Sequence, residues 1–305
     1  MDGIKVLDKY IDEYAALYNG DTTELIKAFA DESVDMEMFS PPFSSLYTYS
    51  NSDRDLGNCK DDDEFFRHFG FITKELYRIL KPGRIMAVHC MNLPTSKEKD
   101  GYIGIRDFRG DLIRAFQDVG FIYHSEVCIW KNLVTAMQRT KALGLLQKQL
   151  KKNSCMSRMG LPDYVVFMRK PGENQSCVTH TNESYPVSEW QNVASPIWDE
   201  ANSPVWWDIN QSDTLNKGVK DEESERHIAP LQLPVIERCL RLYSNEGDVV
   251  FTPFLGIGSE VYQAVKMKRL GIGIELKPAY FESAVENVKR AEMELNQTTL
   301  FDFME

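Results

Sequence analysis

The segment "GDVVFTPFLGIGSEVYQAVKMKRLGIGIEL", residues 247–276, decides the fold of this chain. Its pattern predicts a strand, a glycine-rich turn ("LGIGS"), a helix and a second strand that ends at Glu275. Gly256 and Gly258 leave the backbone free to approach a ligand at the carboxyl end of the first strand. Glu275 stands where an acid takes up ribose hydroxyls in dinucleotide-binding folds. Because Val261 stands at the position of the third glycine of the dinucleotide motif, we expect a nucleoside cofactor without a pyrophosphate, which points away from NAD.

Helices and strands alternate along the rest of the chain, as is typical of α/β proteins. Further strands are expected at 34–39, 85–91, 123–131 and 162–170. Helices are expected as a short N-terminal lead-in, from Asp21 or Thr22 to Phe29, and at 61–80, 105–121, 231–245 and 279–295. We therefore expect an open, largely parallel sheet with ligands beyond the carboxyl ends of its strands.

The composition is that of an ordinary globular protein, with 305 residues, 43% hydrophobic and 27% charged. No apolar run approaches the roughly 18 residues of a membrane span, and the acidic, polar N-terminus predicts neither a signal nor a transit peptide. Six cysteines are scattered without a C-x-x-C pair, so we expect reduced thiols and no metal site. These features favour the cytoplasm, without a membrane partner.

Charge is unevenly distributed in this acidic chain. The net charge of −11 argues mildly against nucleic-acid binding. Between Glu126 and Asp163, however, there is no acidic residue. The basic residues of this stretch are Lys131, Arg139, Lys141, Lys148, Lys151, Lys152 and Arg158. Two interpretations stay open: a surface for a polyanion such as DNA, or the solvated face of an amphipathic helix.

A polar segment follows, from Pro171 to about Asp221, and it holds four of the five tryptophans, at 190, 198, 206 and 207. Long irregular segments inside compact proteins are usually functional or disordered, and the tryptophans argue against disorder. The aromatics either pin a long loop to the body or help to form a recognition surface.

The tetrapeptide Ser40-Pro41-Pro42-Phe43 follows the strand at 34–39. Proline has no N–H to donate, so the pair cannot continue a sheet ladder. The turn presents carbonyl acceptors beside an aromatic ring, which suits a planar ring with an exocyclic amino group, such as adenine or cytosine. The alternative is a stiff surface turn.

These two motifs together give the chain a family resemblance. Ser40–Phe43 matches a [D/N/S]-P-P-[Y/F] motif, and "FLGIG", residues 254–258, matches an F-x-G-x-G turn. The chain thus resembles the DNA amino-methyltransferases, which move a methyl group from S-adenosylmethionine to N4 of cytosine or N6 of adenine. The matches cover 19–90 and 225–290, and the proline motif precedes the glycine motif, as in the circularly permuted beta class.

The resemblance implies a fold and an organisation. We expect the Rossmann-like α/β sheet of S-adenosylmethionine-dependent methyltransferases, with circularly permuted motif order and an inserted target-recognition region. Residues 1–130 would form the catalytic half, 131–222 a basic and tryptophan-rich insertion, and 223–305 the half that binds the cofactor. The combination of "SPPF" with "FTPF" and "GIGSE" looks most like the solitary enzymes of phages and prophages.

The resemblance also implies a set of site residues. Asp21 would lie near the cofactor adenine, and the segment that begins "RHIAP" at residue 226 would close over the methionine end. The implied cofactor-binding residues are Asp21, His227, Pro230, Thr252, Pro253, Phe254, Gly256, Gly258 and Glu275. The sequence departs from the family where Thr252 replaces an aspartate, and where Ser259 and Glu260 replace a small residue and a threonine.

The implied mechanism rests on Ser40, Pro41, Pro42 and Phe43. The Ser40 side chain and the Pro41 carbonyl would accept the two amino hydrogens while Phe43 stacks on the flipped base, so catalysis is positioning and electrostatics. Serine in the first position favours cytosine N4 over adenine N6. The basic residues would contact double-stranded DNA, without need of a restriction partner, and the sequence leaves a homodimer open. Two alternatives remain: a methyltransferase for RNA or a small molecule, and an inactive DNA-binding remnant.

Overall fold

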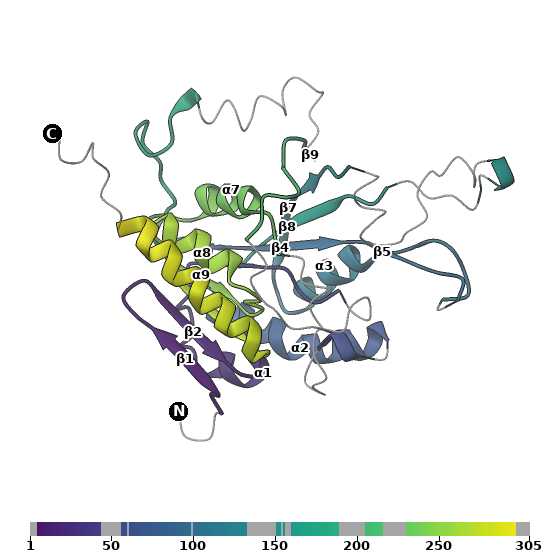
Figure 1. Ribbon diagram of the computed structural model, residues 1–305, viewed down its shortest axis with the longest axis horizontal. Coiled ribbons are helices and arrows are strands. Elements are labelled where there is room, and N and C mark those ends of the chain that lie inside the picture. The colour runs from purple at the N-terminus through teal and green to yellow at the C-terminus, as the bar shows by residue number, and fades with distance from the viewer. Residues whose placement is uncertain are drawn as a thin grey trace.

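The structure is a computed structural model, and it describes residues 5–43, 56–59, 61–98, 100–132, 151–153, 155, 160–188, 205–215 and 230–296. In this part of the chain, nine strands form one sheet in the order β1-β2-β11-β10-β3-β4-β8-β7-β9 (Figure 1). The strands are β1 Asp8–Ile11, β2 Ala15–Asn19, β3 Met36–Phe39, β4 Ile85–Met91, β7 Ile122–Ile129, β8 Asp163–Arg169, β9 Val205–Trp206, β10 Val249–Thr252 and β11 Leu270–Glu275. A separate short ribbon pairs β5 (Leu93–Pro94) with β6 (Ile105–Arg106).

The centre of the sheet is parallel. Strands β2, β11, β10, β3 and β4 run in one direction. Strand β8 is antiparallel to both β4 and β7, and β1 is antiparallel to β2 at the edge. Two strands from the end of the chain, β10 and β11, therefore lie in the middle of the sheet, between β2 and β3 from its beginning.

Helices cover both faces of the sheet. On one face, α2 (Asp62–Ile79) and α3 (Phe108–Asp118) pack against β3 and β4, in a core that includes Phe39. On the other, α7 (Leu233–Tyr243), α8 (Ser259–Lys266) and α9 (Pro278–Asn296) bury their apolar sides. Short helical turns are also present at α1 (Thr22–Leu25), η1 (Ile26–Ala28) and η3 (Leu56–Asn58).

Local chemistry accounts for the ends of these elements. Asp61 caps α2 by accepting the Glu64 N–H at 2.9 Å, and acidic residues in the first turn favour the positive end of the helix dipole. Strand β3 ends at Phe39 because prolines follow at 41 and 42. Apart from the N-terminal lead-in and shifts of a few residues at the ends, the predicted strands and helices are confirmed.

One prediction is wrong: the N-terminal lead-in is a β-hairpin, not a helix. Strands β1 and β2 pair with each other, and β2 extends the parallel sheet through β11. The residues of β2 alternate between buried and half-buried, the pattern of an inner strand with a period of two. Pairing with β11, which lies about 250 residues later in the chain, thus overrides the helix-like spacing of the lead-in.

Candidate active site

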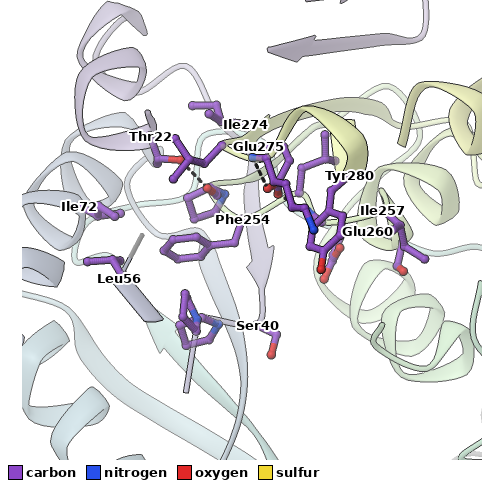
Figure 2. Close-up of a pocket in the computed structure, with 18 of the residues that line it drawn as sticks. Thr22, Ser40, Leu56, Ile72, Phe254, Ile257, Glu260, Ile274, Glu275 and Tyr280 are labelled. Atoms are coloured by element: carbon purple, nitrogen blue, oxygen red, sulfur yellow. Dashed lines mark hydrogen bonds between the residues drawn. The ribbon is translucent and has the colours of Figure 1, made fainter. Parts of the chain in front are cut away.

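The carboxyl ends of β3, β10 and β11 open into one pocket (Figure 2). The proline motif enters it from β3, the glycine turn from β10 and Glu275 from the end of β11. The predicted residues that line it are Asp21, Ser40, Pro41, Pro42, Phe43, Pro230, Pro253, Phe254, Gly256 and Glu275. Segments more than 200 residues apart in sequence thus share one cavity.

Glu275 holds the glycine turn against the end of β11. Its Oε2 accepts the Gly256 N–H at 2.8 Å, and its Oε1 accepts the Lys277 N–H at 2.8 Å. Figure 2 shows the first of these bonds at the pocket wall. Gly256 has a φ of 54°, and a Cβ built there would project into open space. Glycine is therefore needed for the backbone conformation, and its lack of a side chain keeps the cavity open.

The first helical turn, α1, closes the pocket beside the glycine turn. Asp21 caps α1, and its Oδ1 accepts the Thr23 N–H at 2.9 Å. Thr22 donates its hydroxyl to the Pro253 carbonyl at 2.7 Å in a buried position (Figure 2). This bond joins the start of the chain to the end of β10, so that the two predicted cofactor segments are fixed together.

The wall between the glycine turn and the proline motif is apolar. Phe254 stacks on Phe69 with ring centroids 6.4 Å apart and contacts Phe39 edge-on at 5.8 Å. Leu56 and Ile72 line the same side of the pocket (Figure 2). An apolar cavity with a carboxylate at one end fits the flat base and the ribose hydroxyls of S-adenosylmethionine. The residues present therefore fit the expected cofactor.

The proline motif leads to a chain of polar side chains behind the pocket. Ser40 Oγ lies 3.0 Å from His89 Nδ1, on the neighbouring strand β4. His89 Nε2 lies 3.1 Å from Asp163 Oδ2, at the start of β8. Lys131 Nζ lies 2.5 Å from the same carboxylate oxygen. Phe43 contacts the His89 ring edge-on at 6.3 Å, which places the imidazole directly behind the motif.

Two acids near the site have displaced pKa values. Burial alone would raise the pKa of Asp163, but the adjacent Lys131 and His89 lower it to about 2, so this carboxyl is ionised. Glu260, which lines the pocket at the start of α8, has its pKa raised to about 8 by burial, although its backbone N–H opposes the shift. The side chain that replaces the family's threonine is therefore mostly neutral at pH 7.

Two of the predicted cofactor residues, Thr252 and Gly258, do not line the pocket, and a third lies outside the described residues. Thr252 is buried at the end of β10, and its hydroxyl has no hydrogen-bond partner in the described part of the chain. Gly258 precedes α8 with a φ of 88°, and a Cβ there would lie 3.1 Å from the Ala284 Cβ, so its role is helix packing. His227 lies outside the described residues.

The basic segment is described only in part. Lys151 and Lys152 are exposed, whereas Lys131 is engaged by Asp163 and its side chain is only 19% exposed. Arg139, Lys141, Lys148 and Arg158 lie outside the described residues, as do Trp190 and Trp198. Contact of the segment with DNA stays a prediction.

Of the described tryptophans, Trp206 is buried in the core beside α7, and the Arg238 guanidinium lies 5.3 Å above its ring. Trp206 anchors its polar segment to the protein core and does not line the pocket. This agrees with the interpretation in which the aromatics hold a long loop against the rest of the protein. Trp207, its neighbour, is 43% exposed.

Sequence reasoning missed several residues of the site. His89 and Asp163 stand in apolar strands, and only their polarity within "IMAVHCM" and "PDYVVFM" distinguishes them. Lys277 and Tyr280 closely follow Glu275 and line the pocket. Among the described residues, no group of three or more His, Cys, Asp or Glu is placed to hold a metal ion. No described helix has the length and hydropathy of a membrane span.

Comparison with known proteins finds a family and several relatives. The profile of the DNA methylase family N6_N4_Mtase matches residues 34–286. The Type II methyltransferase M.MjaI of Methanocaldococcus jannaschii is 26% identical over 233 residues, which cover 74% of this chain and 69% of the relative. The Type II methyltransferase M.HpaI of Haemophilus parainfluenzae is 22% identical over 269 residues, 86% of this chain and 70% of the relative.

Solved structures share the fold. A Thermus thermophilus protein assigned as a DNA modification methylase, in complex with S-adenosyl-L-methionine, superposes with a TM-score of 0.63 at 20% identity, over 93% of this chain and 97% of that chain. The PvuII DNA methyltransferase (cytosine-N4-specific) gives a TM-score of 0.63 at 18% identity, over 96% and 98%. At these identities the likeness concerns the fold.

Proposed function

The chain belongs to the N6/N4 DNA methylase family, and from that premise we propose that it methylates N4 of cytosine in double-stranded DNA. It is an S-adenosylmethionine-dependent DNA amino-methyltransferase. The observation that carries the finer proposal is that Ser40–Phe43 lines the same pocket as the glycine turn and Glu275. A base held by the proline motif would therefore meet the methyl donor.

The bound cofactor supplies a methyl group that is attached to a positively charged sulfur. Once the methyl group has been transferred, that sulfur is part of a neutral thioether. Glu275, at the end of β11, would accept the ribose hydroxyls, and Asp21 would lie near the adenine. The protein backbone at Gly256 would pass close to the cofactor, because no side chain there fills the cavity. Pro230 lines the pocket on the α7 side, where the methionine end would lie.

The target base would enter beside the proline motif. The Ser40 hydroxyl and the Pro41 carbonyl would accept the two amino hydrogens, and the half-buried Phe43 would stack on the ring. Phe43 rests edge-on against Phe108 at 6.3 Å, which fixes its face. Two acceptors and one aromatic plate would hold the nitrogen in line with the methyl group, and such positioning is a major part of catalysis.

Cytosine is proposed over adenine because the first motif residue is a neutral serine. The PvuII enzyme, named as cytosine-N4-specific, shares the fold over nearly its whole length. N6-methyladenine is the alternative product, since both bases carry an amino group that Ser40 and Pro41 would accept.

The remaining parts of the proposal concern the setting. Residues 1–130 and 223–305 would form one methyltransferase domain in permuted order, a proposal supported by the position of β10 and β11 between β2 and β3. The exposed Lys151 and Lys152, together with Arg139, Lys141, Lys148 and Arg158, would contact phosphates. We further propose a solitary cytoplasmic enzyme of phage or prophage type, which needs no restriction partner; a homodimer is compatible with this.

The proposal is tested by expressing the protein in a host that lacks DNA methyltransferases, and analysing its genomic nucleosides by mass spectrometry. N4-methylcytosine is expected, and Ser40→Ala and Phe43→Ala should each reduce it to less than about a hundredth. A Ser40→Ala variant that methylates as fast as the wild type would refute the assigned role. Ser283→Ala, a half-buried serine of α9 that does not line the pocket, is the matched control.

A further inference from the structure

We propose that His89, held by Asp163, is a positioning residue that turns the Ser40 hydroxyl into a hydrogen-bond acceptor for the target amino group and receives the proton that Ser40 passes on. The inference rests on the proposed function, since it concerns the same serine. It adds His89 and Asp163, which belong to no motif of the sequence, and Lys131, which in sequence belongs to the basic segment.

The side chains form a continuous path from the pocket into the sheet. Ser40 Oγ and His89 Nδ1 are 3.0 Å apart, His89 Nε2 and Asp163 Oδ2 are 3.1 Å apart, and Lys131 Nζ is 2.5 Å from that oxygen. Three adjacent strands supply the path, since Ser40 follows β3, His89 lies in β4 and Asp163 begins β8. The register pairs Asp163 with Met91, so the acid stands at the same sheet edge as the pocket.

The charges along this path select one tautomer of His89. The Lys131 ammonium, 2.5 Å from Asp163 Oδ2, helps to lower the Asp163 pKa to about 2, so this carboxylate is an acceptor only. In a neutral imidazole we infer that the nitrogen 3.1 Å from this carboxylate, Nε2, carries the proton. Nδ1 presents its lone pair to Ser40, so the Ser40 hydroxyl donates to His89 and its own lone pairs point toward the pocket.

A serine needs such a partner, whereas an aspartate in the same position does not. A carboxylate is an acceptor in any orientation, but a hydroxyl offers one donor and two acceptor directions and rotates freely. Without His89 the hydroxyl would be as ready to donate toward the base as to accept from it. The path therefore fixes the neutral serine as an acceptor toward the pocket, as a carboxylate would be, with the ionised Asp163 and Lys131 pair at its far end.

Burial supports a functional role for this path. His89 is 7% exposed and Asp163 is 3% exposed. Removing ionised and polar groups from water is costly, and a buried ion pair is often no more stabilising than apolar residues of similar volume. The neighbours of His89 in β4 are all buried apolar residues, so an apolar residue would fit the strand.

The proton balance of methyl transfer uses the same path. The amino nitrogen forms a bond to the methyl carbon with its lone pair, and the electrons of the carbon–sulfur bond stay on sulfur. The nitrogen then carries a positive charge and must lose one proton. That proton passes to Ser40 Oγ while the Ser40 hydroxyl proton passes to His89 Nδ1, and the resulting imidazolium is stabilised by Asp163.

The first test is a kinetic cycle with His89→Ala, Ser40→Ala and the double variant, measured as single-turnover methylation of DNA. We expect His89→Ala to lower the rate by about 100-fold while the KM for DNA and the affinity for S-adenosylhomocysteine stay unchanged. In the Ser40→Ala background, loss of His89 should change the rate by less than about 3-fold, because the path acts through the serine. Additive losses would overturn the inference.

Two further variants, Asp163→Asn and His89→Gln, test the same path in other ways. Asp163→Asn places an amide donor opposite the imidazole and favours the wrong tautomer, so the rate should fall without loss of cofactor binding. His89→Gln fills the site and serves if the alanine variant fails to fold; its amide has no basic nitrogen, so the rate should also fall. His124→Gln, an exposed histidine of β7 that contacts Ser125, is the matched control and should keep full activity.

The second test does not depend on activity. The chain contains five histidines, and His89→Gln assigns the His89 signals in a ¹⁵N NMR spectrum of the ring nitrogens. We expect the spectrum of His89 to show a protonated Nε2 and an unprotonated Nδ1. A protonated Nδ1 would overturn the inference even in an active enzyme, whereas wild type with this tautomer but no methylated base would refute only the proposed function.

Discussion

Replacing Glu275 with glutamine isolates the charge of the carboxylate that closes the cofactor turn. In the structure each carboxylate oxygen accepts one backbone N–H, from Gly256 and from Lys277, both at 2.8 Å. A glutamine keeps one acceptor and turns an NH₂ group toward the other N–H. One of the two amides then loses its partner, and a ribose hydroxyl meets a donor in place of a charged acceptor.

The expected magnitude follows from these contacts. A hydrogen bond to a charged group contributes about 1.5–3 kcal/mol, so the loss of one such bond to the ligand should cost about 2 kcal/mol of binding free energy. That corresponds to a dissociation constant about 30-fold higher. The lost backbone contact should also lower the stability of the turn.

Isothermal titration of S-adenosylhomocysteine measures this directly, without any assumption about the base that is methylated. The matched control is Glu282→Gln, an exposed glutamate one turn into α9, which should bind as the wild type does. Circular dichroism of both variants checks that the sheet is intact. A Glu275→Gln protein that binds within about 3-fold of the wild type would refute the assigned role of the carboxylate.

Three other substitutions have definite expected outcomes. Glu37 is fully buried in β3, and neither of its carboxyl oxygens has a hydrogen-bond partner in the described part of the chain. Burial, opposed by Lys170, raises its pKa well above the usual value. Glu37→Met should therefore raise the free energy of unfolding by about 1–3 kcal/mol, as measured by urea titration at pH 7. Thr22→Val removes the buried bond to the Pro253 carbonyl and should lower that free energy by about 1–2 kcal/mol and weaken binding of S-adenosylhomocysteine. The pKa of Glu260 is about 8 in the folded protein, against 4.5 in the unfolded chain. Protonated Glu260 therefore favours the folded state fully below pH 4.5, and the stability of the wild type should fall as the pH rises from there to 8. In thermal melts, Glu260→Gln should reduce this dependence of stability on pH.

Each of these predictions has an outcome that contradicts it. Unchanged or reduced stability of Glu37→Met would mean that the carboxyl has a buried partner. Thr73→Val, which removes a hydroxyl that donates to the Gly70 carbonyl within α2, is the control for Thr22→Val, and an equal loss of S-adenosylhomocysteine binding in both would remove the special role of the Pro253 contact. For Glu260, melting temperatures of wild type and variant that run parallel from about pH 5 to pH 9 would contradict the raised pKa.

Patterns within a single segment predict much of this fold. The strand, turn and helix of 247–276 and the capped helix α2 each follow from periodicity, glycine and acidic residues that are neighbours in sequence. The pocket residues of the two motifs were predicted for the same reason, since each motif is short and contiguous. What these segments could not show is that Thr22 donates to Pro253, 231 residues later.

Contacts between distant strands set the limit of such reasoning. The hairpin of β1 and β2 has no turn motif that separates it from a helix, and its register depends on β11. His89 and Asp163 are ordinary polar interruptions of buried strands until the register of β4 and β8 brings them together. Lys131 belongs to a run of basic residues in sequence, and only the structure shows that its ammonium lies against a buried carboxylate.

The most direct measurement is the reaction of the purified protein with unmethylated duplex DNA and S-adenosylmethionine that carries a deuterated methyl group. The DNA is digested to nucleosides, and mass spectrometry identifies the base that received the label. The account predicts labelled N4-methylcytosine from the wild type and almost none from Ser40→Ala. Labelled N6-methyladenine would contradict the proposed base, and no label in DNA from a protein that binds S-adenosylhomocysteine would contradict DNA methylation itself.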